Sequence, residues 1–403
     1  MSDAIDEVVT VVGIGADGWT GLAPVGREAI ESADVVMGSA RQLKLVPHSA
    51  EQIAWPSPLS ESLPGLLAQN RGRRVVVLAS GDPTFHGIGT TLTRLLGPEA
   101  VRVIPSPSSV SLACARLGWA QDQVQVVSLV GHPLELLHPH VQPGRRIVVL
   151  SWGAHTPAEV AATLTARGYG DSELTVLERL GSADERIRRT TASNFAENDV
   201  HSLNVVGITC RAIPDAPLLS TSPGLPDEAY ESDGQLTKRE VRAVTLSRLA
   251  PTPGQLLWDV GGGAGSIAIE WSRHHPSCRA VAIEQDDTRA KRLARNAAAL
   301  GVVVDVVIGK APEALAELET PQAIFVGGGA TRPGMVEACW QALAPGGRLV
   351  VNAVTLETEA VVAKWYAELG GDLVRLSVQK ASPVGGMTGW RAAMPVTIWS
   401  VTK

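Results

Sequence analysis

The sequence contains little cysteine. Its four cysteines stand alone in the chain, at Cys114, Cys210, Cys278 and Cys339. None of them has a second cysteine at the short spacing that zinc sites use, and isolated thiols are typical of a reducing compartment. We therefore expect reduced thiols, no disulfide and a cytoplasmic protein.

Long basic runs and long hydrophobic runs are also missing. Lys and Arg number 35 against 41 Asp and Glu, and no run is basic enough to grip a phosphate backbone. The segment Met1–Glu7 is acidic where a secretory signal would be basic, and the apolar stretch Val8–Ile14 is too short to span a membrane. These features predict neither nucleic acid nor a membrane as a partner.

A histidine-rich segment suggests a metal site at first sight. It contains His132, His138 and His140, but Pro133 and Pro139 interrupt it. Prolines break the helix or strand that would hold three imidazoles on one face. We therefore interpret the segment as a surface loop and expect no metal.

The chain is long enough for two domains. Its 403 residues fit two cores of about 200 residues each. Between residues 214 and 228 the chain is rich in Pro and Ser, which is typical of a linker. We predict domains over residues 1–213 and 229–403, joined by a Pro-rich linker over residues 214–228.

Both predicted domains alternate apolar, strand-like runs with helical patterns, which is typical of α/β folds. In the first domain the predicted strands are 8–12, 75–78, 101–104, 124–129, 147–150, 174–177 and 203–210. In the second they are 256–260, 280–283, 302–308, 323–326 and 348–352, and then 373–379 and 396–401. The last two are separated by a Gly-rich loop without a helix, so we predict a parallel sheet that ends in an antiparallel hairpin.

The most informative run joins the first two strands of the second domain. A buried strand, Leu256–Val260, leads into a turn almost bare of side chains, and a helical pattern starts at Ser266. The turn consists of Gly261, Gly262, Gly263, Ala264 and Gly265. A ligand can approach this backbone closely, and the amides of the turn and of the helix N-terminus face one small space. The next strand ends at Glu284, whose carboxylate can accept hydrogen bonds from both ribose hydroxyls, so the sequence predicts an adenosine-binding crevice.

The spacing of the glycines distinguishes two kinds of adenosine cofactor. A dinucleotide fingerprint needs G-x-G-x-x-G beneath a pyrophosphate, but position 266 is Ser and Asp259 precedes the turn. The Asp259 carboxylate repels a diphosphate and tolerates the sulfonium and ammonium groups of S-adenosylmethionine, which we predict as the cofactor. A nicotinamide-dependent oxidoreductase and an ordinary tight turn are the alternatives.

This turn and its acid resemble the first motif and the ribose-binding acid of the Rossmann-like class I methyltransferases. Three turns of the first domain, each at the C-terminal end of a predicted strand, resemble those of the tetrapyrrole methylase family. They are Gly13–Gly18, Leu78–Phe85 and Pro105–Val110, and the likeness continues through Gly38–Arg41, Val130–Pro133 and Glu178–Gly181. The resemblance implies a two-lobed tetrapyrrole methylase fold followed by a Rossmann-like class I methyltransferase fold, both α/β.

In the order of its two domains, the chain resembles the family of bifunctional, decarboxylating precorrin C5,15-methyltransferases. The second part opens with Gly224–Glu228 and the run Leu236–Arg242. The resemblance implies methylation of precorrin-6B at positions 5 and 15 with loss of the ring C acetate carboxylate, which gives precorrin-8 in aerobic cobalamin synthesis. It suggests position 5 for the first domain, position 15 with decarboxylation for the second, and a homo-oligomer, a dimer or tetramer. In an alternative, the first domain only binds the tetrapyrrole substrate.

The resemblance also implies which positions surround the cofactor. In the second domain these are Thr237, Gly261, Gly262, Gly263, Ala264, Gly265, Glu284 and Ala311; in the first they are Ala16, Asp82, Phe85, Ser109 and Val110. Thr237 has a second interpretation, because it forms a T-x-x-E capping box with Glu240. No catalytic acid or base is predicted, because methyl transfer to an electron-rich enamine carbon depends mainly on alignment.

A precorrin bears many carboxylates while the chain is net acidic, so we expect local arginines to bind it. The candidates are Arg41, Arg186, Arg188, Arg189, Arg239, Arg242 and Arg391, and each has a solvated surface position as its alternative. The Gly-rich loop Lys380–Arg391 is either a mobile cover whose Trp390 stacks on the macrocycle or a plain hairpin connection.

Overall fold

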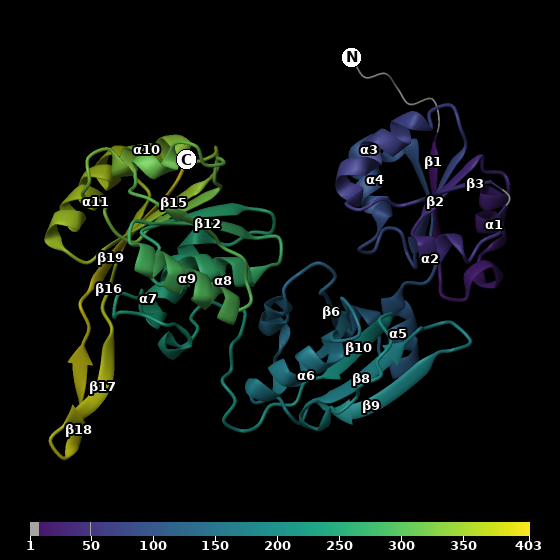
Figure 1. The fold of residues 1–403 in the computed structure, drawn as a ribbon. Coiled ribbons are helices and arrows are strands. Elements are labelled where there is room, and N and C mark those ends of the chain that lie inside the picture. The colour runs from purple at the N-terminus through teal and green to yellow at the C-terminus, as the bar shows by residue number, and fades with distance from the viewer. Residues whose placement is uncertain (1–7, 49) are drawn as a thin grey trace. The chain divides into compact units, whose positions relative to one another are not determined.

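The computed structural model describes residues 8–48 and 50–403 of the chain (Figure 1). The chain divides into two compact units. The first comprises the residues up to Leu134 together with Pro143–Pro217, and the second comprises Glu135–Gln142 with Leu218–Lys403. Each unit is built from sheets flanked by helices, so the predicted α/β fold class is confirmed.

The first sheet of the first unit is wholly parallel, with the strand order β3-β2-β4-β1-β5. Its elements are β1 (Val9–Ile14), α1 (Pro24–Glu31), β2 (Val35–Gly38), α2 (Ala40–Leu43), β3 (Glu51–Ala54), α3 (Leu59–Gln69), β4 (Val75–Ser80), α4 (Ile88–Leu96) and β5 (Val101–Ile104). Successive residues of β1, such as Val11 and Val12, are buried in different apolar clusters on the two faces of the sheet. Helices therefore cover both faces, which is why these strands are continuous apolar runs.

The second sheet of the first unit is mixed, with the order β6-β7-β10-β8-β9. Its elements are α5 (Ser109–Leu117), β6 (Val124–Ser128), β7 (Arg146–Leu150), α6 (Thr156–Ala166), β8 (Glu173–Glu178), β9 (Arg186–Thr191) and β10 (Asn204–Thr209). Only β6 and β7 pair in parallel. The edge strand β9 is rich in Arg and Thr and carries no apolar run, so it was not among the predicted strands.

The sheet of the second unit has the order β13-β12-β11-β14-β15-β19-β16, in which β11 to β15 are parallel and β19 and β16 are antiparallel. Its elements are α7 (Arg239–Leu249), β11 (Leu256–Val260), α8 (Ser266–His274), β12 (Arg279–Glu284), α9 (Asp287–Ala299), β13 (Asp305–Ile308), β14 (Ala323–Val326), α10 (Met335–Ala342), β15 (Arg348–Ala353), α11 (Leu356–Leu369), β16 (Asp372–Leu376) and β19 (Val396–Thr402). Residues of α7, α8 and α9 pack in one apolar cluster and those of α10 and α11 in another, one on each face of the sheet. Trp258, Trp271 and Trp399 are buried in these clusters.

The strand order reverses between β11 and β14, and this reversal positions the site. From β11 the chain runs outward through β12 to β13, then returns to place β14 on the other side of β11. In open parallel sheets, ligands bind beyond the carboxyl ends of the strands at such a switch point. The glycine turn follows β11 directly, so the fold places it at this crevice.

Two segments differ from the expected loops. The Gly-rich stretch between β16 and β19 forms a two-stranded antiparallel hairpin of β17 (Gln379–Val384) and β18 (Met387–Ala392), which is drawn as the yellow projection in Figure 1. The histidine-rich segment contains a short 3₁₀ helix, Leu134–His140, and is not wholly a surface loop, since Leu137 and Pro139 are buried. In the described part of the chain, no helix has the length and apolar character to cross a membrane.

Candidate functional site

The glycine turn has a backbone that other residues adopt only with strain. Gly261, Gly263 and Gly265 have φ angles of +79°, +56° and +82°. A Cβ atom at Gly265 would lie 2.5 Å from Cγ of Leu293, whereas at Gly263 the nearest atom would be the Gln235 carbonyl oxygen at 3.6 Å. Gly265 is therefore needed for packing, and Gly263 leaves open space beside its backbone.

Glu284 holds the turn from the neighbouring strand. Its Oε2 accepts a hydrogen bond from the amide of Gly263 at 2.9 Å, and its Oε1 accepts one from the amide of Asp286 at 2.9 Å. The amides of Gly261 and Gly262 donate to the carbonyl oxygen of Ile283, which binds the turn to the end of β12. A carboxylate has about four acceptor positions, so Glu284 keeps capacity for hydroxyl donors of a ligand.

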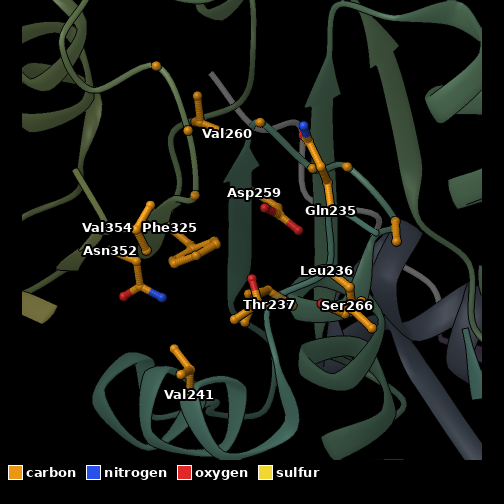
Figure 2. Close-up of a pocket in the computed structure, with 18 of the residues that line it drawn as sticks. Gln235, Leu236, Thr237, Val241, Asp259, Val260, Ser266, Phe325, Asn352 and Val354 are labelled. Atoms are coloured by element: carbon orange, nitrogen blue, oxygen red, sulfur yellow. The ribbon is translucent and has the colours of Figure 1, made fainter. Parts of the chain in front are cut away.

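A cavity of about 590 Å³ opens over this edge of the sheet (Figure 2). Its volume lies within the range of about 300–1,000 Å³ typical of small-molecule sites. We call one side, beyond β11 and β12, the glycine side; its lining includes Gly261, Gly262, Gly263, Ala264, Glu284 and Ala311. We call the other, beyond β15, β16 and β19, the apolar side; its lining includes Val241, Asn352, Val354, Leu376, Val378, Met394 and Val396. In Figure 2, Phe325, Asn352 and Val354 lie on one side of Asp259, while Gln235, Leu236 and Ser266 lie on the other.

Asp259 lies at the bottom of this cavity, at 1% exposure. Its Oδ2 accepts a hydrogen bond from the amide of Ala268 in α8 at 3.1 Å. Burial, reinforced by the negative charge of Glu284, raises the pKa of the Asp259 carboxyl from 3.8 to about 7. The carboxyl group therefore titrates near neutral pH, and a cation bound above it would favour the ionised form.

The other expected positions of this unit differ in their surroundings. Thr237 lines the cavity, and the capping-box interpretation is wrong because α7 begins at Arg239, with Lys238 as its N-cap and no side-chain cap hydrogen bond. Ala311 lines the cavity, and its carbonyl oxygen accepts a hydrogen bond from Nη1 of Arg332 at 3.0 Å. Gly265 is the N-cap of α8, behind the residues that line the cavity.

In the first unit, the three predicted turns meet at the carboxyl ends of their strands. A Cβ atom at Gly13 would lie 2.2 Å from the carbonyl oxygen of Gly81 and 2.8 Å from the amide of Ser106. The amide of Gly81 also donates to the carbonyl oxygen of Ile14 at 3.0 Å. The segments that carry Ala16, Asp82 and Ser109 therefore start from one small region.

The candidate side chains of these turns have local roles that the structure describes. Asp82 Oδ1 accepts hydrogen bonds from the amide and hydroxyl of Thr84 at 2.8 and 2.7 Å, which stabilises the turn. Phe85 is exposed and packs edge-on against His86. Ala16 is half-buried, Ser109 begins α5, and Val110 is buried in the core of the second sheet.

Three of the seven candidate arginines form ion pairs with carboxylates of this chain. Arg186 and Arg188 bind Glu178 and Asp199. Arg242 is completely buried and binds Glu270 and Asp227. Arg41 donates to the hydroxyl of Ser80 at 3.0 Å, and Arg189, Arg239 and Arg391 are exposed. The buried Arg242 is structural, since releasing it to a substrate would leave Glu270 unpaired in the core.

Sequence reasoning missed several polar residues of the cavity lining, and two of these features bear on its chemistry. One is Asn352, a polar residue near the end of β15 that follows the apolar residues 349–351. The other is an ion pair of 3.3 Å between Lys380 of β17 and Glu240 of α7. A single polar residue within the apolar run 349–353 is a sequence signal that could have identified Asn352. The ion pair has no such signal, because it joins segments far apart in sequence. Within the described residues, no three or more His, Cys, Asp or Glu side chains are grouped as metal ligands.

Two family models match the chain. Residues 8–196 match the tetrapyrrole (corrin/porphyrin) methylases, and residues 228–403 match a precorrin methyltransferase domain. The precorrin-6Y C(5,15)-methyltransferase (decarboxylating) of Sinorhizobium sp. is 49% identical over 398 residues, which are 98% of this chain and 96% of the relative.

Two shorter relatives each match about half of the chain. The cobalt-precorrin-7 C(5)-methyltransferase of Salmonella typhimurium is 34% identical over 204 residues, 50% of this chain and 98% of the relative. The probable cobalt-precorrin-6B C(15)-methyltransferase (decarboxylating) of Pyrobaculum calidifontis is 37% identical over 185 residues, 44% of this chain and 94% of the relative.

Proposed function

Because the chain belongs to the family of decarboxylating precorrin-6Y C5,15-methyltransferases, we infer that it is a bifunctional C-methyltransferase of cobalamin biosynthesis. It methylates a precorrin at positions 5 and 15 and removes one carboxylate as carbon dioxide. The observation that carries this function is the cavity that joins the glycine turn and Glu284 to an apolar surface, in a chain whose other half is a tetrapyrrole methylase. The nicotinamide alternative and the substrate-binding alternative have no support among these relatives.

The methyl donor is S-adenosylmethionine, and the glycine side fits it. When bound, this cofactor supplies an electrophilic methyl group. Glu284 would accept hydrogen bonds from the ribose hydroxyls, and the open backbone at Gly263 would allow close approach. The buried Asp259 would favour the cationic end, and Ala311 would lie against the adenine.

We assign position 15 and the decarboxylation to the second unit, and position 5 to the first. Two observations support this division. Separate relatives, each of about half this length, carry a C(5) and a decarboxylating C(15) name. The 204 residues aligned with the C(5) relative also exceed the length of the second family match, 228–403. In the first unit, Ala16, Asp82, Phe85, Ser109 and Val110 would surround the cofactor.

The apolar side of the cavity suits both reactions. Methyl transfer to an electron-rich carbon requires alignment and exclusion of water, which side chains such as Val241, Leu376 and Val396 provide. Loss of carbon dioxide from an acetate arm leaves an electron pair that the conjugated macrocycle accepts. An apolar surface also favours this loss, because it solvates the reacting carboxylate less well than water does.

Mass spectrometry of precorrin-6B incubated with the enzyme and S-adenosylmethionine tests the function. The expected product, precorrin-8, carries two additional methyl groups and has lost the carboxylate of the ring C acetate. A substrate whose mass stays unchanged, while the protein binds S-adenosylhomocysteine normally, would refute the proposed reaction.

We also propose that the protein is a cytoplasmic homo-oligomer, a dimer or tetramer. The reduced thiols and the biosynthetic role support the location. The hairpin of β17 and β18 supports the assembly, because Val384, Met387 and Trp390 expose 63%, 81% and 75% of their surface. Several large apolar side chains exposed on one hairpin are typical of association surfaces.

A further inference from the structure

The apolar side of the cavity contains one polar side chain whose orientation the core determines. Asn352 lies among Val354, Phe325 and the apolar lining (Figure 2). We propose that Asn352 is a positioning residue: its amide oxygen binds a ring N–H of the tetrapyrrole and orients the carbon to be methylated. This proposal rests on the proposed function.

The first step of the argument concerns Thr245, which is completely buried in α7. Its hydroxyl donates its hydrogen to the carbonyl oxygen of Val241 at 2.8 Å. The hydroxyl oxygen can then only accept, and it accepts from Nδ2 of Asn352 at 2.9 Å. The nitrogen of the Asn352 amide is therefore turned toward Thr245, and Oδ1 is the end without this anchor.

The second step concerns Oδ1 itself. This atom is buried, and among the described residues it has no hydrogen-bond partner. Buried acceptors without partners are rare in native proteins and call for an explanation such as a ligand or an ordered water. Asn352 as a whole is half-buried and lines the cavity, so the proposal places Oδ1 at the edge of the space that the substrate would fill.

The third step concerns what an amide oxygen in these surroundings selects. On the apolar side of the lining, Val241, Leu376 and Val396 carry aliphatic side chains, which donate no hydrogen bond. An amide oxygen surrounded by apolar groups binds an N–H donor, and the ring nitrogens of a partly reduced tetrapyrrole provide such donors beside the carbon that reacts. The ion pair of Lys380 and Glu240 lies at the more exposed part of the lining, where the substituent carboxylates of the macrocycle would contact water.

The hydrogen bond should strengthen as the reaction proceeds. An enamine carbon that takes a methyl group uses its carbon–carbon electron pair for the new bond, and the sulfur of the donor keeps the pair of the broken one. The nitrogen lone pair then forms an iminium, so the N–H becomes more positive and binds Oδ1 more tightly. Interactions that strengthen in the transition state raise kcat more than they lower KM.

The test compares variants of the full-length protein. Asn352→Leu removes the amide at similar volume, Asn352→Asp keeps an acceptor oxygen, and Val351→Ala is the control, because Val351 is buried in the core on the same strand. For each we would measure kcat and KM for methylation at position 15 and for decarboxylation, the Kd of S-adenosylhomocysteine by calorimetry, and the Tm.

We expect Asn352→Leu to lower kcat by about ten- to a hundredfold, the equivalent of one charge-assisted hydrogen bond. Its KM and its affinity for S-adenosylhomocysteine should change by less than about threefold, and Asn352→Asp should recover part of kcat. The control Val351→Ala should lower the Tm without this loss of kcat.

Three results would overturn the assignment: an unchanged kcat in Asn352→Leu, equal losses of kcat in Asn352→Leu and Val351→Ala, or a parallel loss of cofactor affinity. If instead the unmodified enzyme fails to methylate any precorrin, the proposed function itself is wrong, so the two failures are distinguishable.

Discussion

At the scale of single residues, the cavity depends on a backbone that side chains would disturb. Gly265 and Gly334 make this testable, because both are left-handed N-caps of helices, with φ of +82° and +76°. A Cβ atom at Gly265 would meet Leu293 at 2.5 Å, whereas at Gly334 it would meet nothing within 4 Å. The pair therefore separates the cost of a clash from the cost of the backbone conformation alone.

We predict that Gly334→Ala lowers the free energy of unfolding by about 1 kcal/mol, and that Gly265→Ala lowers it by roughly 2–4 kcal/mol because the clash adds to the strain. Urea unfolding of the full-length protein, followed by tryptophan fluorescence, measures both. Equal effects of the two substitutions would show that the contact with Leu293 relaxes without cost.

The buried Asp259 predicts a pH dependence. The unfolded chain releases this proton near pH 3.8, whereas the folded chain holds it to about pH 7. The folded state therefore binds more protons between these values, so the contribution of this group to stability is best below pH 4 and falls as the pH rises to 7. A shift of about three pH units corresponds to about 4 kcal/mol.

Asp259→Asn removes this titration. Relative to the unmodified protein, its free energy of unfolding should rise by roughly 3 kcal/mol between pH 5 and pH 8. Urea unfolding of both proteins at the two pH values gives this difference directly. A difference that stays constant with pH would mean that Asp259 is ionised throughout this range.

At the scale of elements, most apolar strands were predictable and the polar ones were not; β2 is apolar and buried but was not predicted. The predicted strands 256–260 and 323–326 coincide with β11 and β14, because both are largely apolar and buried on both faces. The predicted strand 101–104 coincides with β5, an edge strand in which Arg102 is exposed. The strand β9 was missed because its arginines face carboxylates of β8 and of the segment after β9, a pairing that only the fold creates. For residues 380–391 the sequence allowed both a mobile cover and a plain hairpin connection, because the apolar side chains there are few and lie outside the core.

The hairpin carries a prediction about assembly. The double variant Met387→Ser/Trp390→Ser replaces the two most exposed apolar side chains of the hairpin. It should lower the fraction of oligomer, because it removes apolar area from the association surface. Light scattering coupled to size exclusion measures the mass. The control is Leu218→Ser, which changes an apolar side chain exposed to 62% outside the hairpin. A monomeric unmodified protein would contradict the proposed assembly.

At the scale of the whole molecule, the two units should act in turn on one substrate. In the full-length chain, Asp82→Ala should stop methylation at position 5, and Glu284→Ala should stop methylation at position 15 together with decarboxylation. Mass spectrometry of products from precorrin-6B distinguishes them: the first variant should release a product with one added methyl group and one carboxylate lost.

Mixing these two variants should restore the doubly methylated, decarboxylated product, because each supplies the unit that the other lacks. If Asp82→Ala leaves both methylations intact, Asp82 only stabilises its turn through Thr84. If the mixture produces no more than either variant alone, the two activities are not divided between the units.

The sequence by itself determined the α/β class and the glycine turn followed by a buried acid, because these depend on local patterns: apolar runs, glycines at fixed spacing and one carboxylate at a strand end. Only the tertiary structure decided which polar groups are free to act. Arg242, a candidate for substrate binding, forms a buried ion pair with Glu270, while Asn352 lines the cavity with its amide oriented by Thr245. Such assignments depend on contacts between residues 28 to 107 positions apart, and no local pattern encodes those partners.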